Sequence, residues 1–323
     1  MEQIPYWLAE EQDDRALFDK LRAVGVYDVR VEDLTAGGLT SIQTRLYTLR
    51  GSLNARYVVS EQPNRRARRI VEFYQILGNN HWCASFFPQL LAYSCQGKTY
   101  KLVYEYFDGG VPAPEYKVNS KAFQMSLVDC LNAMSKIRRR DALSKRAGVT
   151  YEYLPYFQAR DPTRSGAEGY AELLSEARSE SLNIVERDVC KVRERWLSLP
   201  KVLSHGDLQR RNILVSSKDE IRIIDADCWG FYPVGFDLGR LYQMEFSTDA
   251  PRMVGVSLAR KMGDDASQRE MWLGVFLSAY LLNRMLLQKR VGSQKYRQFC
   301  RKLLKSQVHI ANALVASSYV EFP

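Results

Sequence analysis

A polar cluster in the middle of the chain carries the side chains that phosphoryl transfer requires. In the run V-L-S-H-G-D-L-Q-R-R-N-I-L-V, Asp207 is followed five residues later by Asn212, and a second apolar run ends at Asp225 and Asp227. One carboxylate can orient a hydroxyl group, while an amide and a further carboxylate offer oxygen ligands for Mg²⁺ on nucleotide phosphates. The alternative, a simple turn and a loop cap, would suit one fragment but not both in this order.

Both fragments resemble the phosphotransferase family that includes aminoglycoside phosphotransferases, choline kinases and homoserine kinases. The family motif reads H-G-D-x-x-x-x-N, then two apolar residues with D-x-D or D-x-E, then D-L. The chain has H-G-D-L-Q-R-R-N, I-I-D-A-D and D-L in that order. The resemblance implies that Asp207 is the catalytic aspartate and that Asn212 and Asp225 are metal ligands. It places Asp227 beside that metal site, and it implies that Asp237 opens a helix and braces the catalytic loop.

Three basic side chains of this loop have roles of their own. We expect His205 to pack and hydrogen-bond within the loop rather than to act as a general base. Arg210 and Arg211 could neutralise charge on the transferring phosphoryl group or bind an anionic acceptor, unless one of them points to solvent. We expect at least one of them to face the site. Arg211 is assigned to catalysis because tyrosine kinases, which this pattern resembles, carry an arginine at its place.

The same resemblance implies an α+β, two-lobed protein-kinase-like fold with a small β-rich N-lobe and a larger helical C-lobe. We expect the N-lobe, with the nucleotide-binding sheet and helix, over residues 1–107. The C-lobe, with the catalytic loop, the metal site and the acceptor-binding helices, would cover residues 108–323. The cofactors that follow from the resemblance are Mg²⁺ and ATP or GTP.

Hydrophobic patterning in the first part of the chain predicts the elements of such an N-lobe. Helices are predicted over 9–25 and 65–77, and strands over 42–50, 55–60, 86–93 and 99–107. Gly37 and Gly38 precede these strands, where they either bring backbone N–H groups to a phosphate or form only a hairpin turn. By resemblance, Glu72 is the helix glutamate of kinase-like folds, and Glu105 and Tyr106 lie in the hinge that hydrogen-bonds an adenine.

After the turn-rich segment 108–114 the pattern becomes helical. The predicted helical segments are 122–137, 168–197, 269–290 and 295–317. Several aromatic residues could stack on a ring of the acceptor, although a place in the core is the common alternative; they are Tyr151, Tyr153, Tyr156, Phe157, Trp229 and Tyr232.

The sequence departs from kinase-like folds in the strand predicted over 55–60. Those folds carry a lysine there that pairs with the helix glutamate and holds the nucleotide phosphates. Here the position falls near Ser60, and no lysine occurs between Lys20 and Lys98. Arg56 lies on the same strand face and is assigned to the cofactor site, and Arg65 or Arg66 could also reach in. If no arginine substitutes, either the nucleotide binds in a different position or the chain is a catalytically impaired, partner-binding or regulatory protein.

Composition restricts the class of protein and its surroundings. A hydrophobic content of 46% over 323 residues supports a folded core. Six cysteines without a C-x-x-C pair and three histidines argue against a disulfide framework or a zinc site. The start Met1-Glu2-Gln3 does not resemble a signal peptide, and the apolar run 271–282 is too short to span a bilayer. We therefore expect a cytoplasmic protein without a transmembrane segment.

The net charge of +9 bears on the acceptor. From residue 238 onward the chain has thirteen Lys and Arg against six Asp and Glu. A basic surface disfavours a cationic aminoglycoside and favours an anionic or saccharide hydroxyl acceptor, unless it serves only solubility. Nucleic acid or an anionic membrane surface would also suit the charge, but no motif supports either. A kinase-fold nucleotidyltransferase is a further alternative.

Overall fold

Alternating apolar residues near the N-terminus build an antiparallel sheet with the order β1-β2-β3-β5-β4. Its strands are β1 (Val26–Asp33), β2 (Gln43–Gly51), β3 (Ala55–Pro63), β4 (Leu90–Gln96) and β5 (Thr99–Glu105). The structure, a computed structural model, describes residues 3–11, 13–34, 43–51, 54–78, 81–137, 167–245, 249–290 and 297–316. The chain divides into one unit of Met1–Pro112 with Leu214–Asp227, and another of Ala113–Ile213 with Cys228–Pro323.

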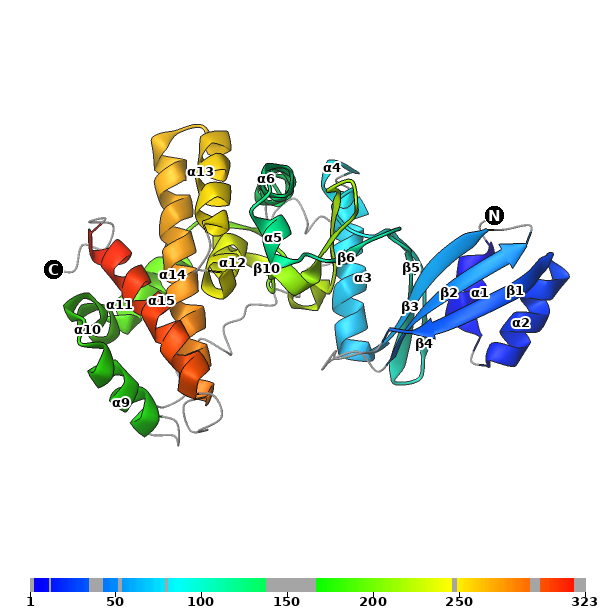
Figure 1. Cartoon of the computed structure of the whole chain (residues 1–323), viewed down its shortest axis with the longest axis horizontal. Helices are drawn as coiled ribbons and strands as arrows, with labels where there is room; N and C mark the ends of the chain where they lie inside the picture. The colour runs from blue at the N-terminus through cyan, green and yellow to red at the C-terminus, as the bar shows by residue number, and fades with distance from the viewer. Residues whose placement is uncertain are drawn as a thin grey trace. The chain divides into compact units, whose positions relative to one another are not determined.

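Helices cover both faces of the first unit's sheet (Figure 1). Helices α1 (Gln3–Glu10) and α2 (Asp14–Ala23) share a core cluster with Val103, whereas α3 (Asn64–Gly78) shares another with its neighbour Leu102. Successive strand side chains point to opposite faces, so the two sets of helices lie on opposite sides of the sheet. A short helix, α4 (His81–Ala84), follows α3.

Two predicted elements of this unit differ in the structure. The helix predicted over 9–25 is two helices, because Asp13 caps α2 by accepting a hydrogen bond from the Arg15 amide at 2.9 Å. The strand predicted over 86–93 begins only at Leu90. The backbone oxygen of Phe86 instead accepts a bond from the Ile223 amide at 2.8 Å, which ties this segment to the second, smaller sheet.

The smaller sheet has the order β6-β8-β9. Its strands are β6 (Val111–Pro112), β8 (Ile213–Val215) and β9 (Ile221–Ile223). β8 and β9 are the two apolar runs of the sequence motif, and both bury alternate side chains. β8 directly follows Asn212, and β9 ends just before Asp225, so each strand fixes one part of the motif.

The second unit is mainly helical (Figure 1). Its elements are α5 (Glu115–Val118), α6 (Lys121–Ser135), α9 (Ala167–Ala177), α10 (Glu180–Arg187), α11 (Val189–Ser198), α12 (Phe236–Glu245), α13 (Ala250–Met262), α14 (Asp265–Arg290), α15 (Arg297–Ala316), and the antiparallel pair β7 (Lys201–Ser204) and β10 (Gly230–Pro233). Its core gathers Trp196, Tyr232, Phe236 and Tyr280. The stretch predicted as helical over 168–197 is three helices, and α13 was not predicted.

Some of the side-chain roles predicted from the sequence concern residues that the structure describes. Tyr232 and Trp229 are buried, so for both the structure supports a place in the core, the alternative to stacking on an acceptor ring. The phosphate or hairpin role of Gly37 and Gly38 concerns residues outside the described part of the chain. The same holds for the stacking role considered for Tyr151, Tyr153, Tyr156 and Phe157. None of the helices that the structure describes combines the length and the apolar character needed to cross a membrane.

Candidate active site

The H-G-D loop of the second unit runs from β7 to a short 3₁₀ turn, Arg210–Asn212. Gly206 adopts a φ of +87°, in the left-handed region that side-chain-bearing residues avoid. A Cβ at this position would collide with the carbonyl oxygen of Cys228, near the start of β10. Glycine therefore lets the catalytic loop approach the neighbouring backbone.

The loop is braced from the first turn of α12. The buried carboxylate of Asp237 accepts hydrogen bonds from the backbone amides of His205, at 2.7 Å, and Gly206, at 2.9 Å. Burial raises the pKa of Asp237, although His205 and the two amides act in the opposite direction. His205 is fully buried, and its Nδ1 accepts a bond from the Asp207 amide at 3.3 Å. These contacts confirm the bracing role expected for Asp237 and the structural role expected for His205.

Both carboxylate oxygens of Asp207 are held. Oδ2 accepts bonds from Gln209 Nε2 at 2.6 Å and Asn212 Nδ2 at 3.2 Å. Oδ1 accepts from Arg240 Nε at 3.0 Å and Arg240 Nη2 at 2.7 Å. Sequence reasoning missed Arg240. Its signal was its spacing: it follows Asp237 by three residues, and side chains three apart lie on one helix face.

The side chains of Arg210 and Arg211 have different partners in the structure. Arg211 Nη2 lies 3.8 Å from Asp207 Oδ2, with its side chain 70% exposed. Arg210 turns away and donates from Nε to Glu245 at 3.2 Å. One of the two therefore faces the loop, as expected. Asn212 is buried, and its Nδ2 also donates to the backbone oxygen of Asp207 at 2.9 Å, so its side-chain oxygen is held in a fixed direction.

The second carboxylate pair belongs to the first unit, after β9. Asp225 has a φ of +65°, a left-handed conformation that is uncommon for a residue with a side chain. Asp227 is buried, and its Oδ2 lies 3.4 Å from Nη1 of Arg66 on α3. Such backbone strain is typical of functional sites, and it sets the direction of the Asp225 carboxylate. In the described part of the chain, no three His, Cys, Asp or Glu side chains gather to hold a metal by themselves.

The predicted nucleotide-side residues also lie in the first unit. Ser60, at the position expected for lysine, is buried, accepts a bond from Gln62 Nε2 at 2.8 Å and lies 3.3 Å from Thr44 Oγ1. Partial burial raises the pKa of Glu72, against the charges of Arg69 and Arg68 on its own helix. Among the described residues, the charges that act on Glu72 come from arginines, and no lysine is one of them.

Arg56 is engaged at the other end of β3. Its Nη1 donates to Asp108 at 3.0 Å, and its guanidinium lies over the ring of Tyr106 at 5.3 Å. Glu105 and Tyr106 both line a cavity of about 420 Å³ together with residues 216–218. The structure thus brings Arg56 to the predicted hinge residue Tyr106 rather than to Ser60.

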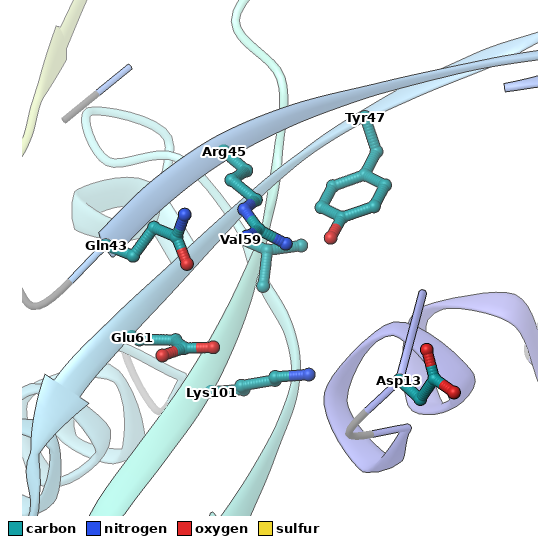
Figure 2. Close-up of a pocket in the computed structure, with 7 residues that line it drawn as sticks. All are labelled: Asp13, Gln43, Arg45, Tyr47, Val59, Glu61 and Lys101. Carbon is teal, nitrogen blue, oxygen red and sulfur yellow. The ribbon is translucent and has the colours of Figure 1, made fainter. Parts of the chain in front are cut away.

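A larger cavity of about 460 Å³ lies on the sheet face turned towards α1 and α2 (Figure 2). Val59 and Glu61 line it, and both alternate with Ser60 along β3. The cavity therefore belongs to the face opposite to Ser60, away from the predicted nucleotide-binding residues. Its lining combines charges of both signs: Asp13, Gln43, Arg45, Tyr47, Val59, Glu61 and Lys101.

Comparison with known proteins agrees with this geometry. A family model described as "Phosphotransferase enzyme family" matches residues 42–272. The GDP complex of aminoglycoside 2'-phosphotransferase-IIIa has a TM-score of 0.57 at 17% identity, over 92% of this chain and 97% of that one. An ethanolamine kinase from Plasmodium vivax has a TM-score of 0.56 at 12% identity, over 96% and 86%. These likenesses confirm the predicted α+β, kinase-like fold class.

A curated protein matches a short part of the sequence. Methylthioribose kinase from Geobacillus kaustophilus (strain HTA426) is 38% identical over 55 residues. The match spans 17% of this chain and only 14% of that kinase. It therefore describes a local likeness and not a shared whole protein.

Proposed function

The chain belongs to the phosphotransferase enzyme family, and we propose that it transfers the γ-phosphoryl group of ATP or GTP, with Mg²⁺, to a hydroxyl group of a small molecule. The observation that carries this proposal is the loop around Asp207. A buried aspartate braces the loop, and hydrogen bonds hold both oxygens of Asp207. Phosphoryl transfer depends on positioning and charge neutralisation, and a carboxylate in one fixed orientation supplies the first of these.

Each motif residue has a role in this proposal. Asp207 accepts a hydrogen bond from the acceptor hydroxyl and directs it in line with the phosphoryl group. Asn212 and Asp225 provide oxygen ligands for Mg²⁺, a cation that prefers such hard donors and keeps few protein ligands. When bound, Mg²⁺ neutralises phosphate charge and orients the phosphoryl group. Arg211 adds positive charge near Asp207, and Asp227 supports the metal site.

The acceptor that we propose is anionic or a saccharide. The net charge of +9, with the excess of Lys and Arg after residue 238, favours an anionic molecule. The local match to a methylthioribose kinase supports a sugar hydroxyl. A cationic aminoglycoside would meet repulsion from the same basic surface.

A second candidate is a catalytically impaired protein that binds a partner or regulates one. It is favoured by a single feature, Ser60 at the place of the strand lysine, with its hydroxyl already hydrogen-bonded within the sheet. Without a cation from another element, the affinity for nucleotide phosphates would be low. The two candidates differ in whether the protein binds nucleotide in a metal-dependent way.

The deciding experiment is calorimetric titration of ATP and GTP, with and without Mg²⁺, into the wild type and Asp225→Ala. Metal-dependent binding that this substitution abolishes supports the phosphotransferase, and an acceptor screen weighted to anionic and sugar hydroxyls follows. Asp249→Ala is the matched control, because Asp249 is exposed and its side chain makes no capping bond to α13. Absence of nucleotide binding by the folded wild type would favour the second candidate. The mass of the product separates gain of phosphate from gain of nucleotide.

A further inference from the structure

The structure leaves the position of the strand lysine without a cation. Ser60 is buried and hydrogen-bonded to Gln62, and the sequence has no lysine between Lys20 and Lys98. Nucleotide phosphates carry several negative charges, and kinase-like sites neutralise part of that charge with a protein cation. Between Lys20 and Lys98, the charged side chains that could supply such a cation are arginines.

Arg56 is placed too far along β3 to serve. It precedes Ser60 by four residues, which corresponds to about 13 Å along a strand at 3.3 Å per residue. Its guanidinium is already paired with Asp108 and lies over Tyr106. Arg56 therefore acts near the hinge residues and leaves the place beside Ser60 to another side chain.

Arg66 lies in the first turn of α3, which begins directly after β3. Its Nη1 reaches to 3.4 Å from Oδ2 of Asp227, beside the proposed metal ligand Asp225. This Nη1 atom is buried and makes no hydrogen bond. A buried N–H group that makes no hydrogen bond is stabilised by a well-aligned acceptor, so the position is suited to a further anionic oxygen.

Helix stability does not explain why an arginine occupies position 66. The first two turns of α3 hold Arg65, Arg66, Arg68 and Arg69, and the first turn has no acidic residue. Positive charge at a helix N-terminus interacts unfavourably with the helix dipole. An anion close to this turn would offset that cost, and Asp227 supplies only one negative charge.

We propose that Arg66 replaces the strand lysine and binds a phosphate of the nucleotide while it also orients Asp227. A guanidinium suits this double contact, because its planar fork can donate to a carboxylate and a phosphate at once. The inference rests on the proposed function, since it assigns a residue to the nucleotide site of that reaction. It makes the chain a nucleotide-binding protein whose phosphate cation comes from α3 instead of β3.

The test is calorimetric titration of Mg·ADP and of adenosine into the wild type, Arg66→Ala, Arg66→Gln and Arg65→Ala. Loss of a charge-assisted contact predicts that both Arg66 variants bind Mg·ADP about 10- to 100-fold more weakly. Adenosine has no phosphate, so its affinity should stay within about twofold of the wild type. Arg65 is the matched control, because it is the exposed neighbour in the same helical turn and should leave both affinities unchanged.

The outcomes separate this inference from the function on which it rests. If the wild type binds Mg·ADP and both Arg66 variants bind it equally well, the role of Arg66 is refuted and the proposed function stands. If the variants lose adenosine and Mg·ADP to the same extent, Arg66 is structural and the inference is also refuted. A wild type that binds neither ligand would overturn both. The glutamine variant keeps most of the side-chain length, which guards against a folding defect in Arg66→Ala.

Discussion

The guanidinium of Arg240 donates from both Nε and Nη2 to a single oxygen of Asp207, at 3.0 Å and 2.7 Å. Arg240 is only 15% exposed, and its Nη1 donates to Gln243 on the same helix. The other oxygen of Asp207 accepts hydrogen bonds from the side chains of Gln209 and Asn212. Arg240 therefore links α12, which braces the loop, to the carboxylate that orients the acceptor. It is a positioning residue, because it acts through Asp207.

Replacing Arg240 should slow the reaction without weakening nucleotide binding. Arg240→Ala removes the two bonds that fix Oδ1, and a misplaced reacting group costs about 10- to 100-fold in rate. Arg240→Lys should recover part of the loss, because an ammonium group offers donors but not the planar fork. The measurement is the rate of ADP formation from Mg·ATP at saturation, beside calorimetric affinity for Mg·ADP.

The control for this prediction is Arg260→Ala, which removes an exposed arginine on α13 and should change neither quantity. A fall in rate accompanied by an equal fall in the urea midpoint would instead make Arg240 a residue of general stability. An unchanged rate in Arg240→Ala would show that Asp207 is held well enough by Gln209 and Asn212.

Asp237 should make the stability of the protein depend on pH in a defined direction. Burial raises its pKa above the ordinary value of 3.8, so the folded state binds a proton more tightly than the unfolded state. The contribution of this group to the free energy of unfolding is therefore greatest below that value and is lost as pH rises through the folded-state pKa. Asp237→Asn does not titrate. The stability difference, wild type minus variant, should fall as pH rises.

Asp264 is the control with the opposite sign. The backbone amide and the hydroxyl of Ser267 hydrogen-bond its carboxylate and lower its pKa. Its contribution is therefore present above the ordinary pKa and lost at lower pH, so the corresponding difference for Asp264→Asn should rise with pH. Urea titrations from about pH 2 to about pH 8 measure both differences. Equal slopes for the two variants would contradict the assignment.

The motif residues could be predicted because they are close in sequence and follow two apolar strands. Asp207, Asn212 and Asp225 were found from spacing, and the bracing contact of Asp237 was expected from the resemblance. Arg240 was missed because its three-residue spacing from Asp237 does not by itself distinguish an arginine that turns into the site from one on a solvated face. Only the packing of α12 against the loop decides this.

The predicted helix boundaries were wrong where a single local interaction ends or begins a helix. The stretch 168–197 has a helical pattern throughout, but Ser179 caps α10 by accepting a bond from the Leu182 amide. Helix α13 was not predicted, and its Pro251 stands in the first turn, where proline is well tolerated. The core position of Tyr232 likewise depends on distant helices that the sequence does not place.

At position 225, aspartate should make the folded protein less stable than glycine would. Its φ of +65° costs a residue with a Cβ about 1–2 kcal/mol, and glycine adopts it freely. Asp225→Gly and Asp225→Ala both remove the carboxylate, so the difference between them isolates the backbone strain. We expect the glycine variant to be more stable by about 1 kcal/mol in urea unfolding, while both lose Mg²⁺-dependent nucleotide binding. An alanine variant as stable as the glycine variant would show that this strain is absent.

Gly206 gives a sharper test of the catalytic loop, because the chain offers a matched glycine. Gly206 and Gly263 have φ values of +87° and +91°, so alanine at either pays a similar backbone penalty. A Cβ at Gly263 meets nothing within 4 Å, whereas one at Gly206 would collide with the carbonyl oxygen of Cys228. Gly206→Ala should therefore lose about 1–3 kcal/mol more than Gly263→Ala in urea unfolding, the usual cost of overpacking.

The same pair of variants separates stability from activity. The collision at Gly206 pushes the loop away from Cys228, so Asp207 moves relative to the Arg240 guanidinium that orients it. The rate of ADP formation from Mg·ATP should then fall about 100-fold in Gly206→Ala, since small misplacements of a reacting group carry that cost. Gly263→Ala lies at the end of α13 and should keep the wild-type rate. Equal rates in the two variants would mean that the loop tolerates displacement, and that Asp207 is positioned by its side-chain partners alone.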